Sequence, residues 1–290
     1  MSAFLKKGVF VEAAIILSFM SSIFVSPAFE AFEINKNNWN NRVPIHLDSE
    51  FYDQKSFLNG KNSLPEIDIN LLGNIKDKSI LHLQCHFGQD SISMARMGAK
   101  VTGIDLSDKA IDEAQKINST LNLDTKFICC NVYDTRENID QKFDIVYTSY
   151  GTIGWLPDLD NWANVISESL KPGGKLIFVE FHPFIWMFDD DFKGIKYHYH
   201  NEKPIIEEYT GTYANKEADI KTDYVGWNHS LSEIFTSLIE HGLEIQHFEE
   251  YDYSPYNCFN ETIEFEKGKF RIKPFENKIP MVFSLMAIKK

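Results

Sequence analysis

The stretch ILHLQCHFGQD at residues 80–90 decides the fold of this chain. Its first part, residues 80–85, is rich in apolar side chains, as expected of a strand that is buried in a sheet. A turn that contains Gly88 follows, and residues 90–97 predict a helix with Gly98 as its C-terminal stop. This order of strand, turn and helix is typical of the first unit of an open parallel α/β sheet.

The same alternation of strands and helices continues towards the C-terminus. A helix with one apolar face is expected after Ser107, which is placed to cap its N-terminus. Further strands are expected at KVTGID (100–105), TKFICC (125–130), FDIVYTS (143–149) and KLIFVEF (175–181). Because each is apolar along most of its length, the pattern predicts a mostly parallel sheet with helices on both faces. The segment IPMVFSLMAIK (279–289) predicts a last strand, which we expect to be antiparallel.

Residues 1–30 form an apolar N-terminal extension that we set apart from the fold. Lys6 and Lys7 precede the apolar run Ala13–Val25. This pattern fits a signal peptide, a membrane anchor or a translation start that is placed too far upstream. We expect a cytoplasmic protein, and an exported or membrane-anchored one only if this segment works as a signal or an anchor. A membrane is a partner only in that second case.

The rest of the chain divides into a cap and a main domain. Residues 31–75 are polar and rich in asparagine, and we expect a helical cap there. Residues 76–290 carry the strand–helix pattern of the main domain. Residues 182–225 interrupt this pattern with aromatic, charged and β-prone sequence, which predicts an insert after strand five.

The composition narrows the possible partners and metal sites. The formal net charge is −13, which argues against a protein that binds a nucleic-acid backbone, so no nucleic-acid partner is expected. A cationic small molecule meets no such repulsion. The four cysteines contain no C-x-x-C pair, so their spacing predicts neither a disulfide framework nor a zinc site, and we expect no metal.

The residues that follow the first three strands predict a binding site for a nucleoside. In an open parallel sheet the ligand crevice lies beyond the carboxyl ends of the strands. Asp105 ends the second strand, 21 residues after Gln84. An acid at that place and distance accepts hydrogen bonds from a ribose diol. Asn131 and Val132 follow the third strand, where a side-chain amide and a backbone N–H could contact the edge of an adenine.

Taken together, these segments resemble the class I S-adenosylmethionine-dependent methyltransferase family from about residue 75 to the C-terminus. The chain is similar in particular to a bacterial subgroup whose first motif reads LHLQCHFGQD. The resemblance rests on Asp105, Asn131, FDIVYTSYGTIGWLPD (143–158) and LKPGGKLIFVEFHP (170–183). The usual family turn is G-x-G-x-G, whereas here Gln84 and His86 replace the first two glycines. The resemblance implies an enzyme with a Rossmann-like fold, S-adenosylmethionine as the cofactor and methyl transfer as the reaction.

The resemblance also implies which residues contact the cofactor. They are Gln84, Cys85, His86, Gly88, Gln89, Asp90, Asp105, Leu106, Asn131, Val132 and Ser149. Gly88 is expected where the backbone meets the amino-acid part of the cofactor, because a Cβ atom there would intrude.

Methyl transfer is an in-line displacement, so alignment of the acceptor matters most, and a base is needed only when the acceptor loses a proton early. We assign catalytic roles to His182, on the loop after strand five, and to Tyr150, beside the methionine part of the cofactor. We expect His229 to be structural and His82 to lie in the core. Trp155 could contact the sulfonium through its ring face or simply pack the following helix.

Aromatic residues of the cap and the insert are expected to cover an acceptor pocket. The substrate residues that we expect are Trp39, Arg42, Trp155, Trp186, Trp227 and Tyr253. A covered pocket favours a small-molecule acceptor that is methylated on N, O or S. Two alternatives stay open, namely an RNA or protein methyltransferase and a non-catalytic protein that binds S-adenosylmethionine.

Overall fold

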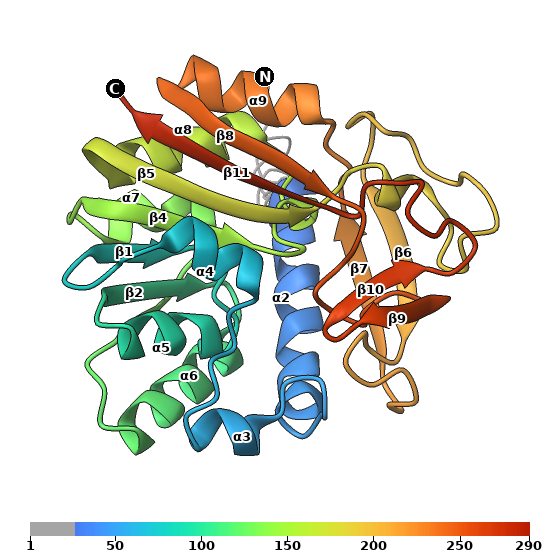
Figure 1. Ribbon diagram of the computed structural model, residues 1–290, viewed down its shortest axis with the longest axis horizontal. Coiled ribbons are helices and arrows are strands. Elements are labelled where there is room, and N and C mark those ends of the chain that lie inside the picture. The colour runs from blue at the N-terminus through green and yellow to red at the C-terminus, as the bar shows by residue number, and fades with distance from the viewer. Residues whose placement is uncertain (1–26) are drawn as a thin grey trace, which may run out of the picture.

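The computed structural model describes residues 27–290, so the apolar run Ala13–Val25 lies outside the described residues. A seven-stranded sheet forms the centre, with the strand order β3-β2-β1-β4-β5-β11-β8 (Figure 1). Its strands are β1 (Ser79–His82), β2 (Lys100–Asp105), β3 (Lys126–Cys129), β4 (Phe143–Ser149), β5 (Leu170–Phe181), β8 (Leu243–Tyr251) and β11 (Val282–Lys289). The pairings among β1 to β5 are parallel, and β11 is antiparallel to both β5 and β8. The predicted mostly parallel sheet with an antiparallel last strand is confirmed.

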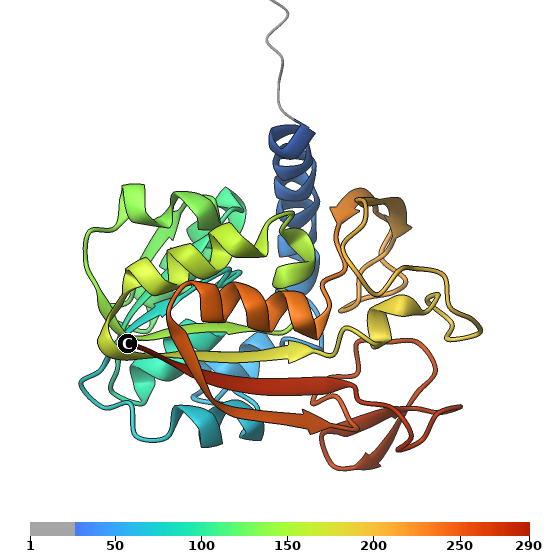
Figure 2. The same cartoon turned by 90° about the horizontal axis from the view of Figure 1, so that it is seen from above.

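Helices cover both faces of this sheet, as the sequence predicts (Figure 2). On one face lie α4 (Glu66–Leu72), α5 (Gln89–Arg96) and α6 (Asp108–Thr120). On the other lie α7 (Thr135–Asn138), α8 (Leu159–Ser169) and α9 (Leu231–Glu240). The core of this second face includes Trp162, Phe178 and Phe283, which are fully buried and stack edge-on or tilted. Burial of such large side chains is the main source of stability of the sheet.

Two further parts lie beyond the carboxyl ends of the parallel strands. The first is the long helix α2 (Pro27–Leu47), which is followed by the short α3 (Gln54–Leu58). The second consists of two small antiparallel sheets, β6 (Ile205–Thr210) with β7 (Lys221–Gly226), and β9 (Thr262–Glu266) with β10 (Lys269–Ile272). Short 3-10 turns lie at Val132–Asp134 (η1), Ile153–Trp155 (η2) and Ile185–Met187 (η3). In Figure 1, α2 runs between the main sheet and the β6–β7 pair.

Side chains of α2 fasten the β6–β7 pair to the rest of the molecule. The side-chain amide of Asn35 makes two hydrogen bonds to the backbone of Val225. Nδ2 donates to the Val225 carbonyl at 2.7 Å, and Oδ1 accepts from the Val225 N–H at 3.1 Å. Asn38 Nδ2 donates to the carbonyl of Asp223 at 2.6 Å. The helical cap that we expected at residues 31–75 therefore packs on the insert, and its first helix begins four residues earlier, at Pro27. Within residues 27–290, no helix has both the length and the apolar character that a membrane span requires.

The first strand is shorter than the apolar run predicts. β1 ends at His82, and the backbone then turns, because Gln84 and His86 adopt left-handed φ angles of 54° and 51°. The amides of Leu83 and Cys85 still donate to Tyr147 and Ile104 of the neighbouring strands, at 2.9 and 2.8 Å. The turn is thus fixed to the sheet on both sides although it is no longer a strand.

The structure corrects the reason that we expected for a glycine at position 88. This residue caps α5 with a φ of 78°, and a Cβ atom on it would lie 2.6 Å from the ring of Phe127 and 3.0 Å from Cβ of Ala114. Glycine is required here because the turn packs tightly on β3 and α6. The close approach is to the protein core, so substitution of Gly88 acts first on stability.

Gly88→Ala should therefore destabilise the fold more than a left-handed φ alone would. Gly173 is a matched control, because its φ is 74° and a Cβ atom added to it would meet nothing within 4 Å. We expect Gly173→Ala to lower the free energy of unfolding by about 1–2 kcal/mol, the cost of the left-handed backbone. Gly88→Ala should lower it by roughly a further 1–3 kcal/mol, because the core is overpacked. Urea denaturation measures both, and equal losses would contradict the packing argument.

Candidate active site

A cavity of about 820 Å³ lies at the carboxyl ends of the parallel strands, between the sheet, α2 and the insert. All the predicted cofactor residues line it, from Gln84 to Asp90 in the first turn through Asp105 and Asn131 to Ser149. Of the predicted substrate and catalytic residues, Trp39, Arg42, Tyr150, Trp155, Trp186 and Trp227 also line it. His182 and Tyr253 do not. The structure therefore brings the two predicted sets together around one space, with two exceptions.

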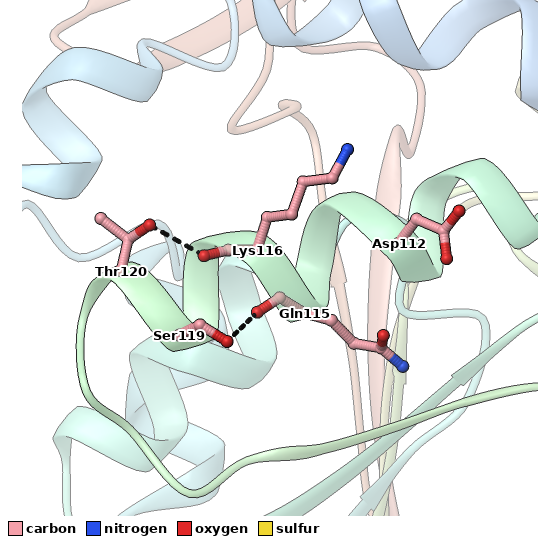
Figure 3. Close-up of a pocket in the computed structure, with 5 residues that line it drawn as sticks. All are labelled: Asp112, Gln115, Lys116, Ser119 and Thr120. Atoms are coloured by element: carbon pink, nitrogen blue, oxygen red, sulfur yellow. Dashed lines mark hydrogen bonds between the residues drawn. The ribbon is translucent and has the colours of Figure 1, made fainter.

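A second depression lies on the exposed face of α6, and Figure 3 shows its five lining residues. All of them belong to the one helix. The hydroxyls of Ser119 and Thr120 donate to carbonyls of the preceding turn, those of Gln115 and Lys116, at 2.8 and 2.9 Å. No groups from other elements converge on this depression, so we place the candidate site in the larger cavity.

Asp105 joins the ends of β1 and β2 at the floor of the cavity. Its Oδ2 accepts from the amide of His86 and its Oδ1 from the amide of Ser107, both at 2.8 Å. Burial raises the pKa of this carboxyl to about 6, although the amide hydrogen bonds act in the opposite direction. At neutral pH it is an anion at the edge of the cavity, and it has lone pairs left for a further donor.

The polar side chains of the first turn are engaged by the surrounding loops. Gln84 Nε2 donates to the carbonyl of Thr152 at 2.9 Å, and Gln89 Nε2 donates to Oε1 of Gln54 at 2.7 Å. Asp90 accepts from the hydroxyl of Ser63 at 2.6 Å, and burial raises its pKa. Gln89 and Asp90 thus hold the cap in place, and Gln84 holds the loop after β4. The groups of the turn that remain for a ligand are on its backbone and, on its side chains, Gln84 Oε1 and His86 Nδ1, which have no partner among the described residues.

Asn131 also has a structural partner. Its Oδ1 accepts from the amide of Tyr133 at 3.0 Å and so caps η1. Contact with an adenine amine would have to use the second lone pair of this oxygen.

A pair of imidazoles connects the cap to the first turn. Nδ1 of His46, on α2, lies 3.0 Å from Nε2 of His86, so one ring donates and the other accepts. Burial lowers the pKa of His46 to about 2 and that of His86 to about 3, and the charge of Arg42 acts in the same direction. Both rings are therefore neutral at physiological pH. The far nitrogens, His46 Nε2 and His86 Nδ1, are buried and have no hydrogen-bond partner within residues 27–290.

Two buried acids order the walls of the site, and the sequence did not single them out. Glu180, on β5, accepts from the amides of Gly151, Thr152 and Phe181, with Oε2 at 2.7 Å from the Thr152 nitrogen. It thus fixes the loop after β4. Asp68, on α4, accepts from the hydroxyls of Tyr147 and Tyr150 at 2.6 and 2.8 Å, and burial raises its pKa to about 7.

The geometry does not support the catalytic base that we expected at His182. Its Nδ1 accepts from the amide of Phe184 at 3.1 Å, and its Nε2 lies 2.9 Å from Oε1 of Glu250, on β8. The ring therefore contacts β8, which lies next to β11 in the sheet, and it does not line the cavity. Tyr253 likewise packs outside the cavity, against Tyr251 and Phe265.

The other expected histidines are structural. His229 contacts the carbonyl of Leu156 and Glu233, at 2.8 and 2.9 Å, and its side chain is fully buried. His82 lies in the core, where its Nδ1 is 2.7 Å from the hydroxyl of Ser91.

Part of the sequence and the fold of the chain resemble those of S-adenosylmethionine-dependent methyltransferases. Residues 80–174 match the family described as methyltransferase domain. The chain is 31% identical over 109 residues to the ubiquinone biosynthesis O-methyltransferase of Pseudoalteromonas translucida, and 32% identical over 104 residues to that of Coxiella burnetii. These matches cover 38% and 36% of this chain and 46% and 44% of the relatives, so the chain spans less than half of their length.

Solved structures of the same fold cover most of the chain. A methyltransferase from Mesorhizobium loti aligns with a TM-score of 0.53 at 18% identity, over 80% of this chain and 100% of its own. Geranyl diphosphate C-methyltransferase from Streptomyces coelicolor, solved with S-adenosylhomocysteine, aligns with a TM-score of 0.58 at 16% identity, over 91% of this chain and 100% of its own. At these identities, the solved structures show that the chain shares their fold.

The neutral state of the paired imidazoles can be measured directly. His46 and His86 should keep the NMR signals of neutral rings from pH 7.5 down to about pH 5, since their pKa values lie well below that of an unfolded histidine, about 6.5. Because only the unfolded chain takes up these protons, the stability that they contribute is present above pH 6.5 and is lost as the pH falls towards 3. A midpoint near pH 6 for either ring would contradict the buried pair.

Proposed function

We propose that the protein is a methyltransferase that transfers a methyl group from S-adenosylmethionine to an N, O or S atom of a small molecule. One observation carries the proposal. The residues expected to contact the cofactor share a single cavity with aromatic side chains of α2 and the insert. The acceptor and the cofactor would therefore meet in a space that the cap and the insert cover. We place the protein in the cytoplasm, where this cofactor is made.

The chemistry of the lining residues fits the cofactor. Asp105 is an anion placed at the end of β2, where it would accept the ribose hydroxyls. Buried polar atoms without a partner within residues 27–290 lie in the first turn, namely Gln84 Oε1 and His86 Nδ1. Such atoms cost free energy unless a ligand or water satisfies them. We expect the adenine beside Asn131 and Val132, and the amino-acid end beside the turn and Ser149.

The residues of this chain would act mainly by positioning the acceptor against the methyl group, and less by acid–base catalysis. When bound, the cofactor supplies an activated methyl group on a sulfonium, which is an excellent leaving group. The walls align the acceptor and exclude water. Burial keeps the pKa of Tyr150 well above its usual value, so its phenol stays protonated at neutral pH. If the acceptor must lose a proton, Tyr150 could accept it on its hydroxyl oxygen and pass its own proton to Asp68.

The two alternatives have weaker support. A methyltransferase for RNA or protein needs an open mouth that a large substrate can reach, and a net charge of −13 opposes an RNA partner. A non-catalytic protein that binds S-adenosylmethionine has no need of the further aromatic side chains of α2 and the insert that line this cavity.

Binding of S-adenosylhomocysteine tests the placement of the cofactor. Asp105→Asn removes the negative charge that would accept the ribose hydroxyls, so affinity measured by calorimetry should fall by about 1–3 kcal/mol. Asp112→Asn, on the exposed face of α6 in Figure 3, removes the same charge elsewhere and should bind as the unaltered protein does. Unchanged affinity in a folded Asp105→Asn variant would contradict the ribose placement, and absence of binding to the unaltered protein would contradict the proposed function.

The same protein distinguishes the classes of acceptor when cell extract is divided into a low-mass filtrate and a macromolecular fraction. Incubated with S-adenosylmethionine labelled on its methyl group, it should transfer label only into compounds of the filtrate. Transfer only into RNA or protein would favour the first alternative. Tight binding without any transfer would favour the non-catalytic one.

A further inference from the structure

Arg42 is a buried cation of the cavity wall, and no anionic partner pairs with it among the residues that the structure describes. It lies on α2, it is only 7% exposed, and it lines the cavity. Within residues 27–290, no carboxylate is in ion-pair contact with its guanidinium, and its Nε is buried without a hydrogen-bond partner. Burial lowers the pKa of Arg42 but an arginine stays charged in proteins, so a full positive charge faces the cavity.

The other cations of the lining are already neutralised or hydrogen-bonded. Lys61 pairs with Asp53 at 3.1 Å, and Lys216 donates to the carbonyl of Phe259 and to Asn260. Arg42 instead lies over the rings of Trp39 and Trp155, at 5.2 and 5.6 Å from the ring centres. Cation–π contacts of this kind are much weaker than the hydration that a charge loses when it leaves water.

The groups that act most on the charge of Arg42 are phenols, which carry no negative charge at neutral pH. Its neighbours include Tyr52, Tyr209, Tyr213 and Tyr224, and burial raises the pKa of each of these phenols, so all are neutral. The acids of the lining are mostly engaged elsewhere. Asp90, Asp105, Glu180 and Asp189 accept hydrogen bonds from a serine hydroxyl or from backbone amides.

We propose that Arg42 binds a carboxylate of the methyl acceptor, so that the substrate is an organic acid whose apolar body lies against the aromatic walls. The inference rests on the proposed function and names the class of its substrate. A guanidinium presents its donors in a planar fork that matches the two oxygens of a carboxylate. A ligand that brings this anion into the cavity would remove the penalty of the unpaired charge, which makes recognition selective for acids over neutral analogues.

The position of Arg42 favours the acceptor over the carboxylate of the cofactor itself. The rings that it covers belong to α2 and η2, and Trp155 also contacts Tyr224 of β7, with ring centres 4.8 Å apart. The guanidinium thus lies among α2, η2 and the insert, with the cap on one side. The residues that we expect to hold the cofactor lie at the ends of β1, β2, β3 and β4.

The test uses benzoate as a probe acid and benzamide as its neutral counterpart, on protein saturated with S-adenosylhomocysteine. Benzoate should bind, and benzamide should bind at least about tenfold more weakly, a difference of about 1.4 kcal/mol. Arg42→Gln should weaken benzoate binding by about tenfold or more and leave S-adenosylhomocysteine affinity within about twofold, which also shows that the variant is folded. Arg42→Lys keeps the positive charge but loses the planar pair of donors. Its affinity for benzoate should therefore lie between that of the unaltered protein and that of Arg42→Gln.

Lys61→Gln is the matched control, because Lys61 lines the same cavity and the charge change is identical. It should bind benzoate as the unaltered protein does. Equal binding of benzoate and benzamide, no binding of benzoate, or unchanged benzoate binding in Arg42→Gln would each overturn the proposal. So would a large loss of S-adenosylhomocysteine affinity in Arg42→Gln with unchanged affinity for 5′-methylthioadenosine, because Arg42 would then hold the carboxylate of the cofactor. If the unaltered protein binds no S-adenosylhomocysteine, it is the proposed function that fails.

Discussion

The carboxylate of Asp105 accepts the amide protons of His86 and Ser107 and so ties the turn after β1 to the end of β2. These two amides come from a left-handed turn and from the N-cap of α6, which are the points where the parallel sheet changes into helices. The same group that fixes this geometry remains an anion at the cavity floor. Burial opposes its charge and the amides support it, which leaves its pKa near 6. The carboxyl edge of the sheet, and with it the candidate site, is built around this acid.

The cap and the insert are parts of the site as well as covers for it. The side-chain amides of Asn35 and Asn38 bind α2 to the backbone of β7. This attachment positions Trp39 and Arg42 on the neighbouring turn of the same helix. His46, further along α2, meets His86 of the first turn. A single helix therefore contacts both the part of the cavity expected to hold the cofactor and the part expected to hold the acceptor. Five buried polar side chains of this region, those of Asn38, Arg42, His46, Gln84 and His86, carry an atom that has no hydrogen-bond partner within residues 27–290.

Much of the fold could be predicted from local sequence, because its elements carry strong local signals. The strand at residues 100–105 and the strand at 143–149 have the predicted bounds, and Ser107 caps α6 as expected, with Ala110 donating to its hydroxyl at 3.1 Å. The end of β1 was misplaced, since the left-handed backbone at Gln84 is not readable from an apolar run. A glycine is needed at position 88 because the ring of Phe127 packs against it. Phe127 is distant in sequence and meets the turn only in the folded sheet, so the local sequence does not show this need.

Part of the candidate site could likewise be predicted from the sequence, and part could not. Residues at the ends of parallel strands could be predicted, because the topology alone brings those ends together. The direction of a side chain on a loop could not, and so His182 was expected in the cavity although it contacts Glu250 outside it. Asp68, Glu180 and His46 were missed because acids and histidines in polar or strand-like sequence give no signal of burial. Their roles follow from long-range contacts, such as those of Asp68 with Tyr147 and Tyr150.

The central claim is that this cavity holds S-adenosylmethionine at the sheet edge with room for an acceptor beside it. A crystal structure with S-adenosylhomocysteine tests it most directly. The account predicts the ribose hydroxyls within hydrogen-bond distance of Asp105, the adenine beside Val132, and open space between the sulfur and the rings of Trp39 and Trp155. A nucleoside bound outside the cavity, or a ribose that does not contact Asp105, would contradict it.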